Sequence, residues 1–194
     1  MTSYHPFRSA TAKEQYLELY DRRAGKWPVV SETRIVDTTY GKTFVRISGP
    51  AGAPPLVLLH GFGGNSLQWM PNIVALSENY KTYALEDLAQ KGEGSRALME
   101  EYVDESYLAL RSFKTKRMVN PTVLTDEELQ CIKVPTLYLV GENEKIYSAQ
   151  KAIQRLRKVA PNIKAEVIPN AGHDLTIVQA AMVNTKVLEF LRQL

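Results

Sequence analysis

The spacing of apolar residues predicts strands and helices that follow one another along most of the chain. Residues 31–39 and 42–48 alternate around a Tyr40-Gly41 turn, which indicates two paired strands. Four consecutive apolar residues within 56–60 are typical of a strand buried on both faces. Further strands are predicted at 80–86, 134–140 and 163–168. Apolar positions at helical spacing predict helices over 11–23, 66–77, 96–118, 147–159 and the last stretch up to Leu194.

This order of elements predicts an α/β fold of three layers with a mostly parallel sheet. Residues 1–29 are expected to form an N-terminal arm and helix. Residues 30–194 are expected to form a single domain, since 194 residues suffice for one hydrophobic core. Thr125 and Glu128 have the spacing of a capping box and predict a further short helix before the strand at 134–140.

Composition and charge narrow the class of protein. A hydrophobic fraction of 44% and a charged fraction of 23% are ordinary for a globular chain, and a net charge of +3 does not indicate nucleic acid. The single cysteine, Cys131, excludes an internal disulfide and fits a reducing compartment. Because no apolar run opens the chain, we expect neither a signal peptide nor a membrane span, and a cytoplasmic protein. The oligomeric state stays open.

A glycine-rich loop follows the apolar run at 56–60. It reads His60-Gly61-Phe62-Gly63-Gly64, and the predicted helix begins directly after it at Ser66. Glycines allow a tight turn and a close backbone approach, and N–H groups at a helix N-terminus favour an anion. This loop alone is compatible with an oxyanion loop and with the phosphate loop of another doubly wound α/β domain.

Three further motifs distinguish these possibilities. Residues 87–95 resemble an Asp-Leu-x-Gly-x-Gly-x-Ser loop with one extra residue before Gly92. Glu144 closes Gly141-Glu142-Asn143-Glu144 after one predicted strand, and His173 closes Asn170-Ala171-Gly172-His173 after the next. In this order the motifs resemble the α/β-hydrolase fold superfamily, and most of all its bacterial carboxylesterase-like members.

The resemblance implies a role for three residues. His173 corresponds to the histidine of a catalytic triad, Glu144 to its acid, and the backbone N–H of Phe62 to an oxyanion-hole donor. It implies a small-molecule ester or carboxylate as substrate, with no cofactor and no metal. No nucleic-acid or membrane partner is implied.

The nucleophile of the family is missing from the pattern. A Gly-x-Ser-x-Gly elbow needs small residues two positions before and after the nucleophile, and none of the candidates has them: Ser66, Ser95, Ser106, Ser148 and Cys131. The nucleophile strand and its neighbours are absent, which indicates an internal deletion near 95–120 and a shortened fold. We expect weak or no esterase activity. A non-catalytic small-molecule-binding module and an engineered or truncated scaffold are the alternatives.

Two geometric expectations follow from the deletion. The strand at 134–140 should fill the vacated place and pair in parallel with the strand at 56–60, because an unpaired apolar edge would otherwise be exposed. The segment between 134 and His173 is uninterrupted, so a carboxylate oxygen of Glu144 should lie within hydrogen-bond reach of a ring nitrogen of His173.

Overall fold

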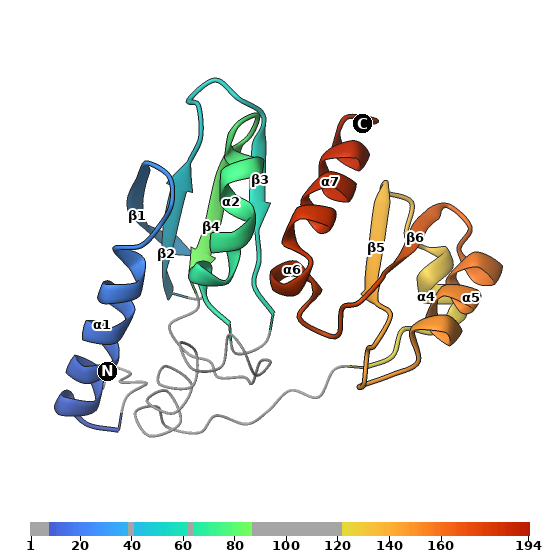
Figure 1. Ribbon diagram of the computed structural model, residues 1–194, viewed down its shortest axis with the longest axis horizontal. Coiled ribbons are helices and arrows are strands. Elements are labelled where there is room, and N and C mark those ends of the chain that lie inside the picture. Colours follow the sequence, from blue (N-terminus) through green and yellow to red (C-terminus); the bar gives the residue numbers. More distant parts are fainter. Residues whose placement is uncertain (1–7, 39–40, 62–63, 87–121) are drawn as a thin grey trace. The chain divides into compact units, whose positions relative to one another are not determined.

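The computed structural model describes residues 8–38, 41–61, 64–86 and 122–194 (Figure 1). The predicted helix at 96–118, the loop at 87–95 and the expected deletion near 95–120 lie outside these ranges. The chain divides into two compact units, Met1–Lys116 and Arg117–Leu194, which are described separately below. That the two units together form the single domain expected over 30–194 stays a prediction.

Unit 1 holds a mixed sheet of four strands. Its elements are α1 (Ala10–Ala24), β1 (Ser31–Thr38), β2 (Gly41–Ser48), β3 (Pro55–Leu58), η1 (Ser66–Trp69), α2 (Met70–Ser77) and β4 (Lys81–Glu86). The strand order is β1-β2-β4-β3. The β1/β2 and β2/β4 ladders are antiparallel, as the turn at residues 40–41 predicts for the first of them. The β3/β4 ladder is parallel, and β3 ends at Leu58, two residues earlier than predicted.

The core of unit 1 fixes η1 and α2 against their neighbours. Leu67 of η1 and Ile73 of α2 are fully buried. Tyr16 and Tyr20 of α1 pack against Leu67, with Trp27 alongside, so α1 contributes to this core. The loop that precedes η1 is therefore anchored at its helical end by apolar contacts.

Unit 2 is a small three-layer α/β structure. Its elements are α4 (Asp126–Gln130), β5 (Thr136–Gly141), α5 (Ala149–Val159), β6 (Ile163–Ile168), α6 (Leu175–Val178) and α7 (Ala180–Leu191). Strands β5 and β6 are parallel, in register from Thr136 opposite Ile163 to Gly141 opposite Ile168. No helix in the described ranges of the chain is long and apolar enough to cross a membrane.

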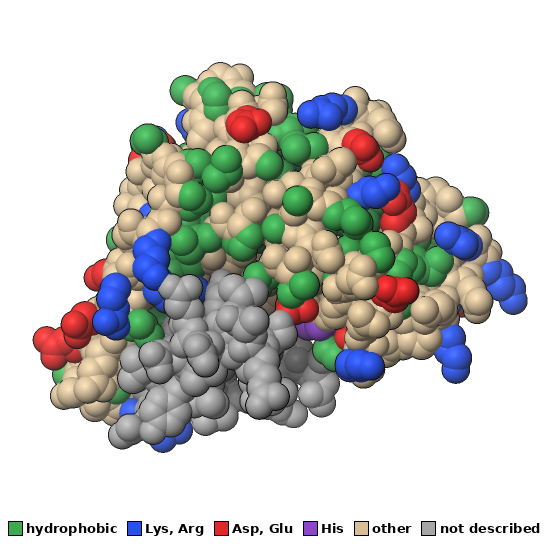
Figure 2. All heavy atoms as spheres, in the orientation of Figure 1, with side chains coloured by type: hydrophobic (Ala, Val, Ile, Leu, Met, Phe, Trp, Pro, Cys, Tyr) green, Lys and Arg blue, Asp and Glu red, His purple; other side chains and the backbone are tan. Residues whose placement is uncertain are grey.

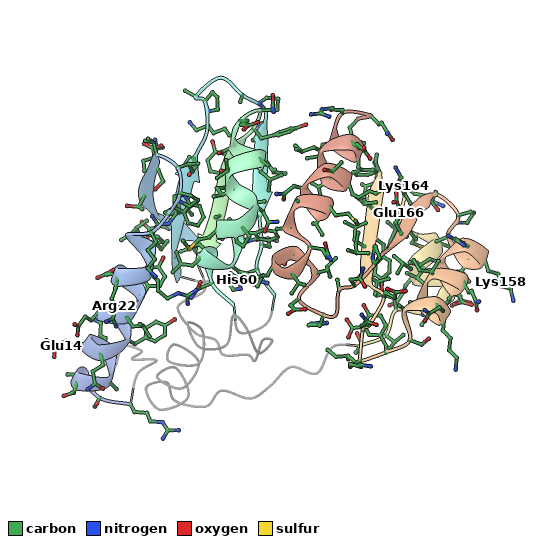
Figure 3. The ribbon with its side chains drawn as sticks, viewed as in Figure 1. Glu14, Arg22, His60, Lys158, Lys164 and Glu166 are labelled. Carbon is green, nitrogen blue, oxygen red and sulfur yellow. The ribbon has the colours of Figure 1, made fainter. Side chains whose placement is uncertain are left out.

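Alternate residues of the two strands face opposite helix layers, as expected for a pleated sheet. Val140 packs against Ala149 and Ile153 of α5. On the other face Ile168 packs with Val183 of α7. Glu166, also on that face, forms a 2.8 Å ion pair with Lys186 of α7, and Figure 3 shows it beside Lys164 on β6. Acidic and basic side chains are interspersed with apolar ones on the face drawn in Figure 2.

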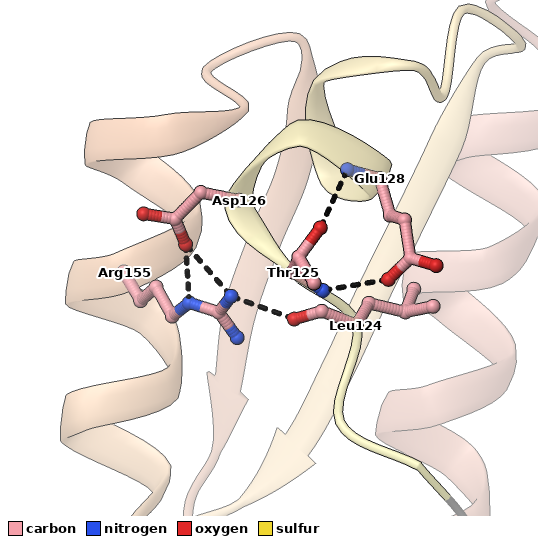
Figure 4. A network of polar contacts seen from close by, with 5 residues as sticks. All are labelled: Leu124, Thr125, Asp126, Glu128 and Arg155. Carbon is pink, nitrogen blue, oxygen red and sulfur yellow. Dashed lines mark hydrogen bonds and ion pairs between the residues drawn. The ribbon is translucent and has the colours of Figure 1, made fainter.

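The start of unit 2 is tied down by the network drawn in Figure 4. The predicted capping box is confirmed, because Thr125 Oγ1 accepts from the Glu128 N–H and Glu128 Oε2 accepts from the Thr125 N–H. Arg155 of α5 donates through Nε to Asp126 and through Nη2 to the carbonyl oxygen of Leu124. The segment just before β5 is thereby attached to the helix that follows it.

The predicted ladder between residues 56–60 and 134–140 would join the two units, and it stays a prediction. The described strands make one sheet within each unit. Strand β3 pairs with β4 and β5 pairs with β6, each within its own strand–helix–strand unit. Val57 and Leu59 are 57% and 67% exposed.

Candidate active site

The loops after β5 and β6 lie side by side, because parallel neighbouring strands end at the same edge of a sheet. Hydrogen bonds continue past the ladder into both loops. The Glu142 N–H donates to the carbonyl oxygen of Ile168 at 2.9 Å, and the Asn143 N–H donates to that of Ala171 at 2.8 Å. The loops that carry Glu144 and His173 are thus held together by their backbones.

Gly141 allows this close approach. A Cβ atom at this position would lie 2.2 Å from the carbonyl oxygen of Gly172 and 2.5 Å from that of Ala171. Both contacts are with backbone atoms, which cannot rotate away as a side chain could. The glycine is therefore a steric requirement of the site, while a Cβ on Gly172 would meet nothing nearer than 3.5 Å.

Glu144 and His173 form a direct contact, which confirms the predicted approach. Oε2 of Glu144 lies 2.8 Å from Nδ1 of His173. Oε1 of Glu144 accepts from the N–H groups of Lys145 at 2.7 Å and Ile146 at 2.9 Å. The Glu144 side chain is 2% exposed, whereas that of His173 is 69% exposed. The carboxylate is enclosed and fixed, and the imidazole is presented outward.

The environment of Glu144 favours its ionised form. Burial acts to raise the pKa of this carboxyl, but it is outweighed by the Ile146 N–H, by His173 and by the Lys145 N–H, so the pKa lies below its usual value. An anionic Glu144 accepts a hydrogen bond, so Nδ1 of His173 must carry the proton. The lone pair of the neutral ring is then on Nε2, which has no hydrogen-bond partner among the described residues.

Glu142 is a second connection between the loops, and the sequence interpretation missed it. Its Oε2 accepts from the Asn170 N–H at 3.1 Å. Asn170 has a φ of 54°, in the left-handed region, where asparagine is among the few residues tolerated. The sequence shows that Glu142 lies directly after the strand. Its partner, the Asn170 N–H, could be assigned only from the fold.

A pair of tyrosines lies close to the same loop. The hydroxyl groups of Tyr138 and Tyr147 are 2.9 Å apart. Burial first, and then this hydrogen bond, raise the pKa of Tyr138 above its usual value, so its hydroxyl stays protonated. No spacing rule in the sequence indicated this contact, because Tyr138 belongs to β5 and Tyr147 to the loop before α5.

In unit 1, the glycine-rich loop uses its own donors. The Gly64 N–H bonds to the carbonyl oxygen of Gly61 at 3.0 Å. Asn65 caps η1, since its Oδ1 accepts from the Leu67 N–H. These N–H groups are therefore not available to an anion. Phe62, the predicted oxyanion donor, lies outside the described residues. His60 stands after β3 (Figure 3), with Nδ1 2.8 Å from the carbonyl oxygen of Gly61.

The serines of the described ranges all have structural hydrogen bonds. Ser66 is fully buried, with its hydroxyl 3.4 Å from that of Tyr20, and Ser148 caps α5 by accepting from the Lys151 N–H. The hydroxyl oxygen of Ser9 accepts from the Ala12 N–H, that of Ser31 from Arg46 and that of Ser48 from Trp27. The Ser77 hydroxyl donates to the carbonyl oxygen of Val74. Cys131 is exposed and caps the end of α4. Ser3, Ser95, Ser106 and Ser112 lie outside the described residues. No group of three potential metal ligands occurs in the described part of the chain.

A carboxylate and a histidine thus meet on loops at the ends of adjacent parallel strands of an α/β fold. The chain is 27% identical to carboxylesterase YbfK of Bacillus subtilis, over 95% of this chain and 96% of that protein. It is 27% identical to the B. subtilis carboxylesterase nap, over 91% and 92%. No protein-family model matches the chain.

Solved structures agree with the sequence relatives. The crystal structure of the naproxen esterase from B. subtilis superposes with a TM-score of 0.83 and 25% identity, over 95% of this chain and 99% of that one. A hydrolase structure from the same organism gives a TM-score of 0.82 at 26% identity. The chain is a carboxylesterase-like member of the α/β-hydrolase superfamily.

The alignment with YbfK also shows how much shorter this chain is within the shared span. It runs over 284 positions, whereas the whole chain has 194 residues. At least 90 positions of the alignment, the difference between those lengths, therefore have no residue of this chain opposite them.

Proposed function

We propose that this protein is a carboxylic-ester hydrolase type of α/β hydrolase that keeps the acid and histidine of the site, Glu144 and His173, but has no serine nucleophile. Its turnover of esters is then weak or nil. The observation that carries the proposal is the 2.8 Å contact between an enclosed Glu144 carboxylate and an exposed His173 ring.

Two further observations support the missing nucleophile. The hydroxyl of each serine in the described ranges already has a hydrogen bond within a cap, a strand or a core contact, as given above. The 90 or more unmatched positions against a carboxylesterase are also more than enough to hold a strand, an elbow and a helix. A point replacement of one serine would leave no such gap.

The chemistry of an intact site indicates what each remaining group does. His173 would take the proton of the nucleophile through Nε2 and later return it to the leaving group. Glu144 would hold the ring through Nδ1 and stabilise its cationic form. The Phe62 N–H would stabilise the oxyanion. Loss of a serine nucleophile from such a set lowers turnover by about 10⁶-fold, so the remaining groups cannot sustain ordinary esterase rates.

The test is reaction with a fluorophosphonate probe, which labels activated serines in one-to-one stoichiometry. We expect no stoichiometric labelling under conditions in which an intact serine esterase is fully labelled. Labelling of the wild-type chain that disappears in one Ser→Ala variant would refute the proposal and identify the nucleophile. Ser95, Ser106 and Ser112 are the first variants to make, because they lie in the segment 87–121, outside the described residues.

The alternative function is that of a small-molecule-binding module without catalysis. Such a module would be stabilised by a small carboxylate or ester without converting it. A ligand present at 100 times its dissociation constant raises the free energy of unfolding by about 2.7 kcal/mol. A thermal-shift response that is lost in His173→Gln, together with no ester turnover, would favour binding over hydrolysis.

A further inference from the structure

We infer that Nε2 of His173 is itself a nucleophile toward small activated esters such as aryl acetates. In this chain the histidine would attack the ester directly instead of activating a serine. The inference rests on the proposed function, because it assumes that no serine stands in front of the ring.

The first support is the tautomer that the contacts impose. Glu144 is enclosed, accepts two backbone N–H bonds and has a lowered pKa, so it is a carboxylate and takes the Nδ1 proton of His173 in a hydrogen bond. The neutral ring then has its lone pair on Nε2. That atom has no partner among the described residues, and the His173 side chain is 69% exposed.

The second support is that Glu144 can stabilise the product of the attack. Nε2 forms a bond to the acyl carbon, the bond to the aryl oxygen breaks, and the aryloxide leaves with the electron pair. The acylated ring keeps its Nδ1 proton and is cationic, so the adjacent carboxylate at 2.8 Å stabilises it. Water then adds to the acyl carbon, the bond to Nε2 breaks, and the carboxylic acid is released with its proton passing to solvent.

The exposure of the ring defines the substrate class. A ring that stands in solvent imposes little binding energy on a substrate, so the leaving group must be good enough to depart without an acid catalyst. We therefore expect a rate that is linear in the concentration of p-nitrophenyl acetate, without saturation. Alkyl esters with poor leaving groups should not react.

The experiment measures p-nitrophenyl acetate hydrolysis by the full chain against the same concentration of N-acetylhistidine. One charge-assisted hydrogen bond on the ring should make the protein at least about tenfold faster per histidine. His173→Gln should reduce the rate to no more than that of two equivalents of N-acetylhistidine, for the remaining His5 and His60. Glu144→Gln should remove most of the advantage over N-acetylhistidine. Glu127→Gln, an exposed carboxylate of α4, is the matched control and should change nothing. Circular dichroism checks that each variant is folded.

The solvent isotope effect separates this inference from the proposed function. Direct attack by Nε2 transfers no proton in the rate-limiting step, so the rate in D₂O should be close to that in H₂O. A marked slowing in D₂O would show that the ring activates water as a general base, which overturns the inference and leaves the proposed function in place. An unchanged rate in His173→Gln would overturn it as well. Fluorophosphonate labelling would remove the proposed function and the inference together.

Discussion

Glu144 shows how a single side chain is prepared for one protonation state. Its two oxygens are shared among the Lys145 N–H, the Ile146 N–H and Nδ1 of His173, with the side chain almost fully enclosed. A carboxylate in this position can be buried because its hydrogen bonds replace those it would make with water. The hydrogen bond to the enclosed Glu144 therefore fixes the orientation of the exposed His173 ring.

Acid titration should show that the folded protein holds Glu144 in its ionised form. The pKa of Glu144 is lowered in the folded state, against about 4.3 in the unfolded chain. A lowered pKa adds stability that is present above the unfolded value and is lost as the pH falls through the folded value. The difference in free energy of unfolding between the wild type and Glu144→Gln should therefore be largest near neutral pH and shrink below about pH 4.

Urea unfolding of both proteins between pH 3 and pH 7, followed by the His173 ring resonance, provides the measurement. Glu127→Gln serves as the control, because that carboxylate is exposed in the first turn of α4. A difference between wild type and Glu144→Gln that stays constant over the whole range would mean that the carboxylate is not held in its ionised form.

At the scale of elements, the site depends on two loops that approach more closely than side chains normally permit. The ladder between β5 and β6 ends at Gly141 and Ile168, and backbone hydrogen bonds continue from there into the loops. Glu142 adds a bond to the Asn170 N–H. The contact of Glu144 with His173 is therefore a consequence of strand pairing, carried a few residues beyond the sheet.

Gly141→Ala should separate the loops. The added Cβ would lie 2.2 Å from the carbonyl oxygen of Gly172, and the backbone must move to relieve the overlap. We expect a loss of about 1–3 kcal/mol in the free energy of unfolding of this unit, the usual cost of overpacking. The downfield Nδ1 proton resonance of His173 should weaken or vanish as its hydrogen bond to Glu144 lengthens.

Gly172→Ala is the matched control, in the facing loop, because its added Cβ has only ordinary contacts. Chemical denaturation of both variants measures the loss of stability, and their His173 proton spectra show whether the hydrogen bond to Glu144 remains. Equal stability and an unchanged resonance in Gly141→Ala would show that the loops can part without loss of the contact, and that the glycine is not needed.

The whole molecule divides into two compact units, Met1–Lys116 and Arg117–Leu194. Leu67 belongs to the first core and Ile168 to the second, and both are fully buried. The two tryptophans of the chain, Trp27 and Trp69, lie in unit 1, whereas His173 lies in unit 2. Fluorescence and the histidine resonance therefore report on different units.

Leu67→Ala should lower the urea midpoint seen by tryptophan fluorescence and leave the midpoint seen by the His173 resonance unchanged. Removal of a buried leucine side chain costs about 2–5 kcal/mol, and here the whole cost falls within unit 1. A common shift of both midpoints would instead show one cooperative unit, as the single domain predicted over 30–194 requires.

Much of the fold and half of the site could be predicted from local pattern. The capping box at Thr125, the strands at β5 and β6 and the approach of Glu144 to His173 depend on residues close together in the chain, or on two strands joined by one helix. Their geometry is therefore determined by spacing and by the rule that parallel strands end at one edge. Glu142 was missed because its partner, the Asn170 N–H, becomes available only in a left-handed turn.

The sequence alone determined the class of fold and the approach of Glu144 to His173, since apolar period and motif order are properties of the chain itself. Only the tertiary structure decided which strands pair. Within the units, β3 joins β4 and β5 joins β6. Pairing is a competition among all available edges, and its outcome depends on loop closure and packing that no local pattern contains. The exposure of His173 beside an enclosed Glu144 was likewise decided by the folded loops, because burial is a property of neighbours rather than of a residue.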